Sequence, residues 1–141
     1  MKKVLLMLIL FVGIASCSVF MNAAQTKKPA KDRVEIIYFH GKQRCATCMA
    51  IERLTREVIS KSFAKEVRNG TLVLKVVDIS TRTGEALADK YEVSWSSLFV
   101  NKWKGDRETR SNLTQFAFGN AKNNPSAFKK GLENKILQML R

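Results

Sequence analysis

Two cysteines, Cys45 and Cys48, stand three positions apart where a buried strand gives way to a helix, and this pattern constrains the chain most. The stretch "VEIIYF", Val34 to Phe39, is short, β-branched and aromatic, and predicts a mostly buried strand. Gly41 breaks it, and a helix is expected from Cys45 to about residue 65. At the start of a helix, the C-x-x-C spacing brings both sulfurs within bonding distance, and the helix dipole favours a thiolate on the first. We therefore expect Cys45 to be the nucleophile and Cys48 the resolving thiol.

The remaining patterns alternate between strand and helix. We expect strands at 71–79, 96–103 and, as a polar edge, 107–111, with helices at 82–93 and from Pro125 and a helical turn at 112–120. One face of the first helix carries the apolar residues Ile51, Leu54, Val58, Ile59 and Phe63, and the last helix repeats Phe128, Leu132, Ile136 and Leu140. This order predicts an α/β fold with a central mixed sheet of four to five strands and helices on both faces.

The amino terminus predicts export. The basic head Met1-Lys2-Lys3 precedes an apolar run of 12 residues, Val4 to Ala15. A membrane-spanning helix needs about 20 such residues, so the pattern indicates a secretory signal peptide rather than an anchor or a core strand.

The end of this run, "IASC" from Ile14 to Cys17, resembles the lipobox of bacterial lipoproteins. The resemblance implies a signal peptide at 1–16, a lipidated Cys17, a flexible tether at 17–32 and a folded domain at 33–141. It also implies a protein anchored by lipid in the bacterial cell envelope and facing the periplasm. Ordinary cleavage after Ala24 is the alternative. In either case Cys17 is removed from the count of free thiols, which leaves Cys45 and Cys48 as a self-contained pair.

The chain is strongly basic, with 25 Lys and Arg against 12 acidic residues and a net charge of +13, or +11 without Lys2 and Lys3. Such a charge suits nucleic acid. Export and the lack of interleaved aromatic residues argue against a nucleic-acid partner. A solvated basic surface is the expected state, and attraction to anionic lipid beside the tether is the alternative.

From Val34 to Leu140 the chain resembles thioredoxin-like proteins, because its C-x-x-C follows the first core strand and opens a helix in a βαβ unit. The stretches "VVD" at 76–78 and "YEVSWSSLFV" at 91–100 fall where that family has its second core strand and its active-site-facing loop. The resemblance implies a redox-active disulfide that needs no other cofactor, in a monomer that acts on exported cysteine-containing clients and is reset by a membrane or periplasmic redox partner. Trp95, Ser96 and Ser97 would form the substrate-facing loop, and Arg44 would stabilise the Cys45 thiolate.

The sequence departs from that family in several places. Ser96 or Ser97 stands where most thioredoxins have a cis-proline, and the two prolines, Pro29 and Pro125, lie elsewhere. Thioredoxins commonly have a buried acid on the first strand that assists the resolving cysteine, and the corresponding stretch here, "IIYF", has none. Arg44 replaces the tryptophan before the first cysteine, and Ala46 and Thr47 replace Gly-Pro between the cysteines.

Without the proline that crowds the sulfurs, metal binding becomes an alternative function. Cys45, Cys48 and His40 would then hold a soft ion such as Cu(I). Copper-delivery proteins of this fold usually have a longer cysteine spacing and a distal histidine, which this chain lacks. His40 is otherwise a proton carrier or a structural residue, and we expect Asp78 to cap a turn. A structural disulfide and a redox-silent interaction domain are the remaining alternatives. The favoured hypothesis is a membrane-tethered thiol–disulfide oxidoreductase that uses the Cys45–Cys48 pair.

Overall fold

The computed structural model describes residues 31–141. The signal peptide, the lipobox with Cys17 and all but the last two residues of the predicted tether lie outside the described residues. The elements run in the order β1 (Arg33–His40), α1 (Ala46–Ser62), α2 (Ala64–Arg68), β2 (Leu72–Asp78), α3 (Arg82–Tyr91), β3 (Ser97–Lys104), β4 (Arg107–Thr109), α4 (Thr114–Asn120) and α5 (Pro125–Leu140).

The four strands form one mixed sheet in the order β2-β1-β3-β4. β1 pairs in parallel with β2, and the crossover between them carries α1 and α2. β3 pairs antiparallel with β1 on its other side and with β4 at the edge. The parallel first half, the antiparallel hairpin and the predicted α/β fold class are confirmed.

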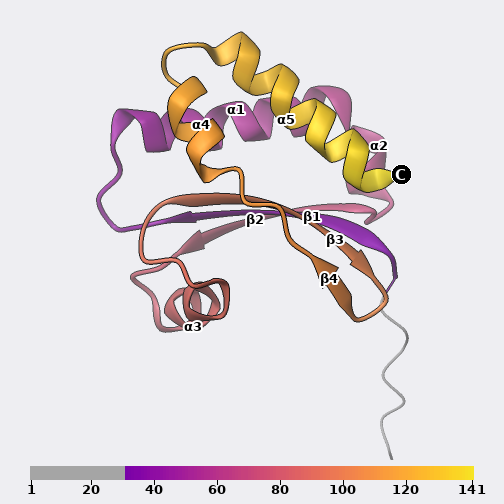
Figure 1. Ribbon diagram of the computed structural model, residues 1–141, viewed down its shortest axis with the longest axis horizontal. Coiled ribbons are helices and arrows are strands. Elements are labelled where there is room, and N and C mark those ends of the chain that lie inside the picture. The colour runs from indigo at the N-terminus through magenta and orange to yellow at the C-terminus, as the bar shows by residue number, and fades with distance from the viewer. Residues whose placement is uncertain (1–30) are drawn as a thin grey trace, which may run out of the picture.

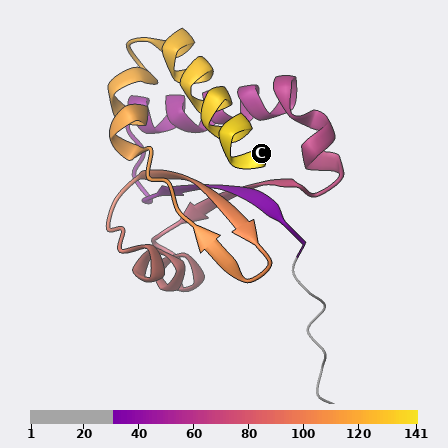
Figure 2. The same cartoon turned by 45° about the vertical axis from the view of Figure 1, so that its right-hand side comes forward.

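Helices cover both faces of the sheet, as the sequence predicted. Figure 1 shows α1, α2, α4 and α5 on one face and α3 alone on the other, and the turned view of Figure 2 agrees. The carboxyl ends of β1 and β2 lie at the same end of the sheet, because these strands are parallel. That end holds the loop that leads into α1.

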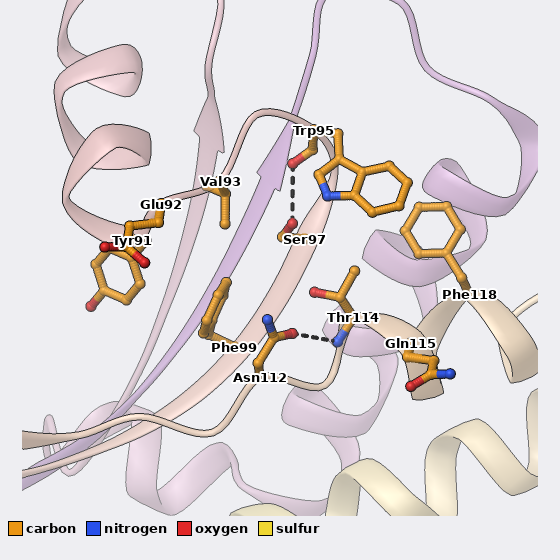
Figure 3. A pocket seen from close by; sticks show the side chains of 10 residues that line it. All are labelled: Tyr91, Glu92, Val93, Trp95, Ser97, Phe99, Asn112, Thr114, Gln115 and Phe118. Carbon is orange, nitrogen blue, oxygen red and sulfur yellow. Dashed lines mark hydrogen bonds between the residues drawn. The ribbon is translucent and has the colours of Figure 1, made fainter.

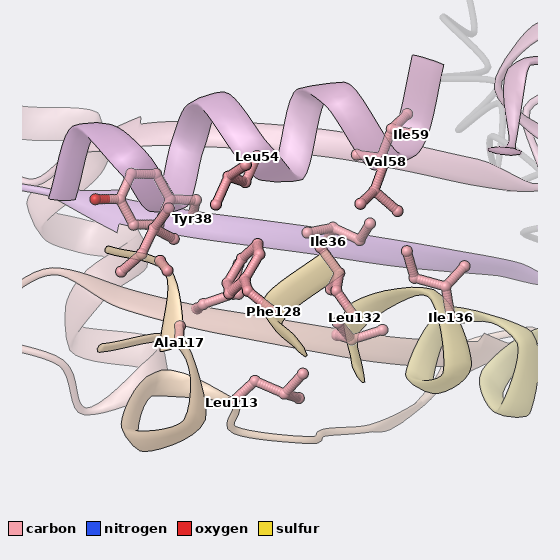
Figure 4. Packing of buried hydrophobic residues seen from close by; sticks show 14 of the residues in the cluster. Ile36, Tyr38, Leu54, Val58, Ile59, Leu113, Ala117, Phe128, Leu132 and Ile136 are labelled. Carbon is pink, nitrogen blue, oxygen red and sulfur yellow. The ribbon is translucent and has the colours of Figure 1, made fainter. Parts of the chain in front are cut away.

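The larger core lies between the sheet and the helices α1, α4 and α5 (Figure 4), and α2 contributes no buried residue to it. Alternate β1 residues, Val34, Ile36 and Tyr38, point into it because side chains of a strand alternate between faces. Ile37 and Phe39 point to the opposite face, where they pack with Ala88, Tyr91 and Phe99. Six consecutive β1 residues, 34–39, are therefore buried, which is why β1 shows no polar alternation.

The first helix is shorter than the sequence predicted. We expected one helix to about residue 65, but the chain leaves helical geometry at Phe63, with φ −131° and ψ 24°. α2 then starts at Ala64. The Phe63 ring is 2% exposed, and its N–H donates to the Ile59 carbonyl at 3.0 Å. Burial of this ring accompanies the break, which lacks the glycine or proline signal of a helix end.

The last helix follows its sequence pattern. The Asn124 side chain accepts a hydrogen bond from the Ala127 N–H at 3.1 Å, and Pro125 occupies the first turn, where its missing N–H has no helical partner to lose. Phe128, Leu132 and Ile136 are fully buried against α1 and the sheet (Figure 4).

Two short elements, β4 and α4, follow β3 in the chain. β4 covers only residues 107–109 of the predicted 107–111, and Asn112 makes an isolated bridge with Phe99 just beyond it. The predicted helical turn is α4, which packs beside α5. Within residues 31–141, none of the helices combines the length and the apolar character that a membrane crossing requires.

Candidate active site at the start of the first helix

Cys45 and Cys48 form a disulfide at the amino terminus of α1, with their Cα atoms 5.1 Å apart. Cys45 is the N-cap residue, in extended geometry with φ −77° and ψ 164°. Its Sγ accepts a hydrogen bond from the Cys48 backbone N–H at 3.1 Å, and its carbonyl accepts one from the Met49 N–H at 3.0 Å. A sulfur at this position lies at the positive end of the helix dipole, which favours a thiolate. The thiolate preference of Cys45 stays a prediction.

The two sulfurs differ in exposure. Cys45 is exposed, whereas Cys48 is 6% exposed and belongs to the buried face of α1. An external disulfide can approach Cys45, while Cys48 is reached mainly from Cys45 itself. The roles of nucleophile for Cys45 and resolving thiol for Cys48 stay predictions, and this difference in exposure is compatible with them.

Tyr38 lies beneath the pair, a position that the sequence did not reveal. Its side chain is fully buried, and its hydroxyl donates a hydrogen bond to the Cys48 carbonyl at 2.8 Å. Burial raises the pKa of this phenol above its usual value, although nearby Arg44 and Ser96 act in the opposite direction. The hydroxyl therefore stays protonated and acts as a donor.

Arg44 does not extend freely toward the sulfurs. Its guanidinium forms an ion pair with Glu52, one turn further along α1 than Cys48, and lies 5.9 Å from the centre of the Tyr38 ring. Burial raises the pKa of Glu52, but hydrogen bonds from Arg44 and Arg56 outweigh this and lower the pKa below its usual value. The positive charge beside Cys45 is thus shared with a carboxylate, and thiolate stabilisation by Arg44 stays a prediction.

His40 and Asp78 end the paired strands β1 and β2 and face each other in register. The Nδ1 atom of His40 lies 3.0 Å from the Gly41 carbonyl oxygen. Asp78 accepts hydrogen bonds from the Ser80 N–H at 2.9 Å and the Ser80 hydroxyl at 2.7 Å, which confirms its expected role in a turn. A chemical role for His40 stays a prediction.

Of the three residues predicted to face the substrate, Trp95 and Ser96 lie in the loop between α3 and β3, and Ser97 is the first residue of β3. Ser97 is buried and donates from its hydroxyl to the Trp95 carbonyl at 3.2 Å, while the Ser96 side chain lies near the Tyr38 hydroxyl. The pairing of Ser97 with Phe39 brings this loop to the end of β1, next to Tyr38. Trp95 is 67% exposed, and its ring stacks on Phe118 of α4 with centroids 6.1 Å apart.

A surface cavity of about 760 Å³ opens beside this loop. Figure 3 shows the Trp95 and Phe118 rings at one end, with Phe99 and Thr114 further along the cavity. The sequence predicted the loop but not the contribution of α4, because a seven-residue helix gives only a short periodic signal.

The structure also bears on the alternative metal site. Among residues 31–141, no three His, Cys, Asp or Glu side chains lie close enough together to hold one ion. In the disulfide-bonded form, then, His40 does not complete a ligand set with Cys45 and Cys48.

No protein-family model and no curated protein sequence matches this chain. Among solved structures it is similar to a thioredoxin from Thermus thermophilus, with 18% identity over 75% of each chain and a TM-score of 0.48. It is also similar to a malarial protein, with 18% identity over 61% of this chain and 92% of the other and a TM-score of 0.40.

The fold follows from the chain's own topology. The order strand, helix, strand, helix, strand, strand, helix, with the parallel pair β1–β2, the hairpin β3–β4 and α4 inserted before the last helix, is thioredoxin-like. The C-x-x-C pair lies at the start of the helix that follows the first of these strands. Residues 31–141 thus form an α/β domain of thioredoxin-like fold with a disulfide-bonded C-x-x-C pair.

Proposed function

We propose that this protein is a thiol–disulfide oxidoreductase that exchanges disulfides with cysteine-containing client proteins through Cys45 and Cys48. The observation that carries the proposal is the unequal environment of the two sulfurs. Cys45 is exposed and caps α1, whereas Cys48 is buried one turn inside. A purely structural disulfide has no need of this asymmetry, and a loop this short gives little entropic stabilisation.

The reductive direction illustrates the chemistry. The Cys45 thiolate attacks one sulfur of a client disulfide, a mixed disulfide forms, and the second client sulfur leaves as a thiolate that takes up a proton. Cys48 then loses its proton and attacks the Cys45 sulfur. The client is released as a dithiol with two electrons gained, and the 45–48 disulfide forms with two electrons lost. Oxidation of a client is the same sequence reversed, and a redox partner resets the pair in either case.

The cavity beside Trp95 supports a protein client. The exposed indole and Phe118 offer an aromatic surface next to the loop whose Ser96 approaches the floor of the site. An extended client segment with an apolar side chain near its cysteine suits this surface, because aromatic rings give large contact area for little conformational entropy.

The amino-terminal pattern supports a location in the bacterial cell envelope. A signal peptide that ends in the lipobox "IASC" would leave the domain tethered through lipid on Cys17, where clients are exported proteins. Cell fractionation tests this part by itself. The wild-type chain should follow the membranes, and Cys17→Ala should abolish lipid attachment. An unlipidated wild-type chain would contradict the tether but not the exchange activity.

The central experiment is a redox titration of the purified protein in glutathione buffers, combined with reduction of an insulin disulfide. We expect one reversible two-electron couple that is lost in Cys45→Ser, together with catalysed insulin reduction by the wild type. Tight stoichiometric binding of Cu(I), with negligible insulin reduction and no reversible couple, would overturn the proposal in favour of a metal-binding module.

A further inference from the structure

The hydroxyl group of Tyr38 is the only side-chain donor, among residues 31–141, that contacts the backbone of either cysteine. It comes from β1, 10 positions before Cys48, and reaches the Cys48 carbonyl at 2.8 Å from a fully buried ring. A carbonyl in the first turn of a helix normally accepts the amide four residues further on, so this hydroxyl is an additional donor.

The peptide group that Tyr38 binds connects both cysteines. Its carbonyl oxygen, from Cys48, accepts the Tyr38 hydroxyl, and its N–H, from Met49, donates to the Cys45 carbonyl at 3.0 Å. Hydrogen bonds at the two ends of one peptide unit polarise each other. Tyr38 thereby fixes the turn of backbone that also aims the Cys48 N–H at the Cys45 sulfur, at 3.1 Å.

Two further segments lie near the Tyr38 side chain. Arg44, from the loop before α1, lies over the ring and is held by Glu52, and Ser96 approaches from the loop before β3. His40 is the other ionisable group near the ring, with a centroid separation of 6.1 Å. Tyr38 thus lies between α1, which begins directly after Cys45, and the loop before β3 that is predicted to face the substrate.

We propose that Tyr38 is a positioning residue for the redox pair: its hydroxyl holds the first turn of α1 in the geometry that stabilises the Cys45 thiolate. Tyr38 serves here as a hydrogen-bond donor and not as a proton acceptor. The inference rests on the proposed exchange activity of Cys45 and Cys48.

The consequence for the redox equilibrium has a definite sign. Stabilising the thiolate stabilises the reduced form, and a more stable reduced form makes the pair more oxidising. Loss of the hydroxyl should therefore make the pair more reducing and should shift the alkylation of Cys45 to higher pH.

The test is Tyr38→Phe, measured by the pH dependence of Cys45 alkylation in the reduced protein and by equilibrium with glutathione. We expect a higher midpoint pH and a change of about threefold to tenfold in the equilibrium constant, the size of one net hydrogen bond. Thr55→Val is the matched control. It also removes a buried hydroxyl, but this one belongs to α1 and has no hydrogen-bond partner within residues 31–141. It should leave both readouts unchanged.

A second measurement keeps the test decisive if Tyr38→Phe does not fold. The chain has two tyrosines, so in a Tyr91→Phe background 3-fluorotyrosine replaces Tyr38 alone. Its more acidic hydroxyl is a stronger donor and should lower the midpoint pH of Cys45 alkylation relative to the unlabelled Tyr91→Phe parent.

An unchanged midpoint and equilibrium constant in folded Tyr38→Phe, or in the fluorinated chain, would overturn the role of Tyr38. The exchange activity would stand in that case. A wild-type pair that does not cycle would instead remove the proposed function itself.

Discussion

Gly131 of α5 lies directly against the Phe116 ring of α4, so a Cβ atom at position 131 would come within 2.4 Å of the ring carbon Cζ. The missing side chain allows the two helices to approach, and α4 carries Phe118, which supports Trp95. Gly131 therefore allows the close packing of α5 on the helix that carries the stacking partner of Trp95.

Gly131→Ala tests this contact. Overpacking at a tight site should lower the free energy of unfolding by about 1–3 kcal/mol, in spite of the better helix propensity of alanine. Urea denaturation gives the measurement. Gly119→Ala is the control, because a Cβ there meets no atom within 4 Å, and it should be neutral or slightly stabilising. Equal effects at both positions would contradict the close approach.

The difference in exposure between the two sulfurs predicts that the two cysteine variants form mixed disulfides to different extents. Cys48→Ser should accumulate a mixed disulfide between Cys45 and a client or glutathione, because the resolving thiol is missing. Cys45→Ser should accumulate far less, because the remaining sulfur is buried at 6% exposure. Non-reducing electrophoresis and intact mass measure both. Similar adducts from the two variants would contradict the assigned roles.

Trp95→Ala separates client binding from chemistry. The specificity constant, kcat/KM, for a protein disulfide should fall roughly tenfold, in line with the loss of one aromatic anchor. Reaction with a small disulfide and the reduction potential should not change. Leu137→Ala removes another exposed apolar side chain, 44% exposed on α5, and serves as control. A parallel loss toward the small disulfide would mean that Trp95 shapes the redox site instead.

We expect the Glu35 carboxylate to make a pH-dependent contribution to the free energy of unfolding. Burial raises the pKa of this carboxyl, but Lys75 at 2.9 Å and Arg33 at 2.7 Å outweigh that effect, and the pKa lies below its ordinary value of 4.5. A lowered native pKa means that the contribution is present above the unfolded-state pKa and is lost as the pH falls through the native one.

Glu35→Gln should therefore lower the free energy of unfolding by about 1–3 kcal/mol at pH 7. The difference from wild type should shrink as the pH drops below 4.5, where the wild-type carboxyl takes up its proton. Urea denaturation across this range provides the measurement. The exposed Glu85, which has no ion pair within residues 31–141, supplies a Glu→Gln control with a small, nearly constant effect. A constant difference at every pH would exclude Glu35 as the source.

Most of the fold could be predicted because each element carries its own periodic signal. β1 is a buried and almost wholly apolar strand, and α5 repeats its buried residues every four positions. β2 was expected to be a second buried strand, but only Leu72 in it is buried, because β2 lies at the edge of the sheet. The break at Phe63 could not be predicted, because Phe63 continues the apolar face of α1 and no glycine or proline marks it. The periodicity of apolar residues does not predict a helix end that coincides with a buried side chain such as Phe63.

The site could be predicted only in part for a similar reason. Cys45 and Cys48 are recognisable from spacing alone, since the helix start brings them together. The contact of Tyr38 with Cys48 depends on which face of β1 the ring takes and on how far the following loop travels. The Arg44–Glu52 pair joins residues eight positions apart across a helix start, a distance at which helix periodicity gives no guidance.

Because the two sulfurs differ in exposure, thiol labelling of the reduced protein can measure local unfolding of α1. A thiol-labelling reagent should reach Cys45 at once and Cys48, 6% exposed, only when α1 opens. The time course of the second label then reports how often that helix lifts away from the sheet. The same two cysteines would thus form the reactive site and report the rate of local unfolding around it, through the labelling rate of Cys48.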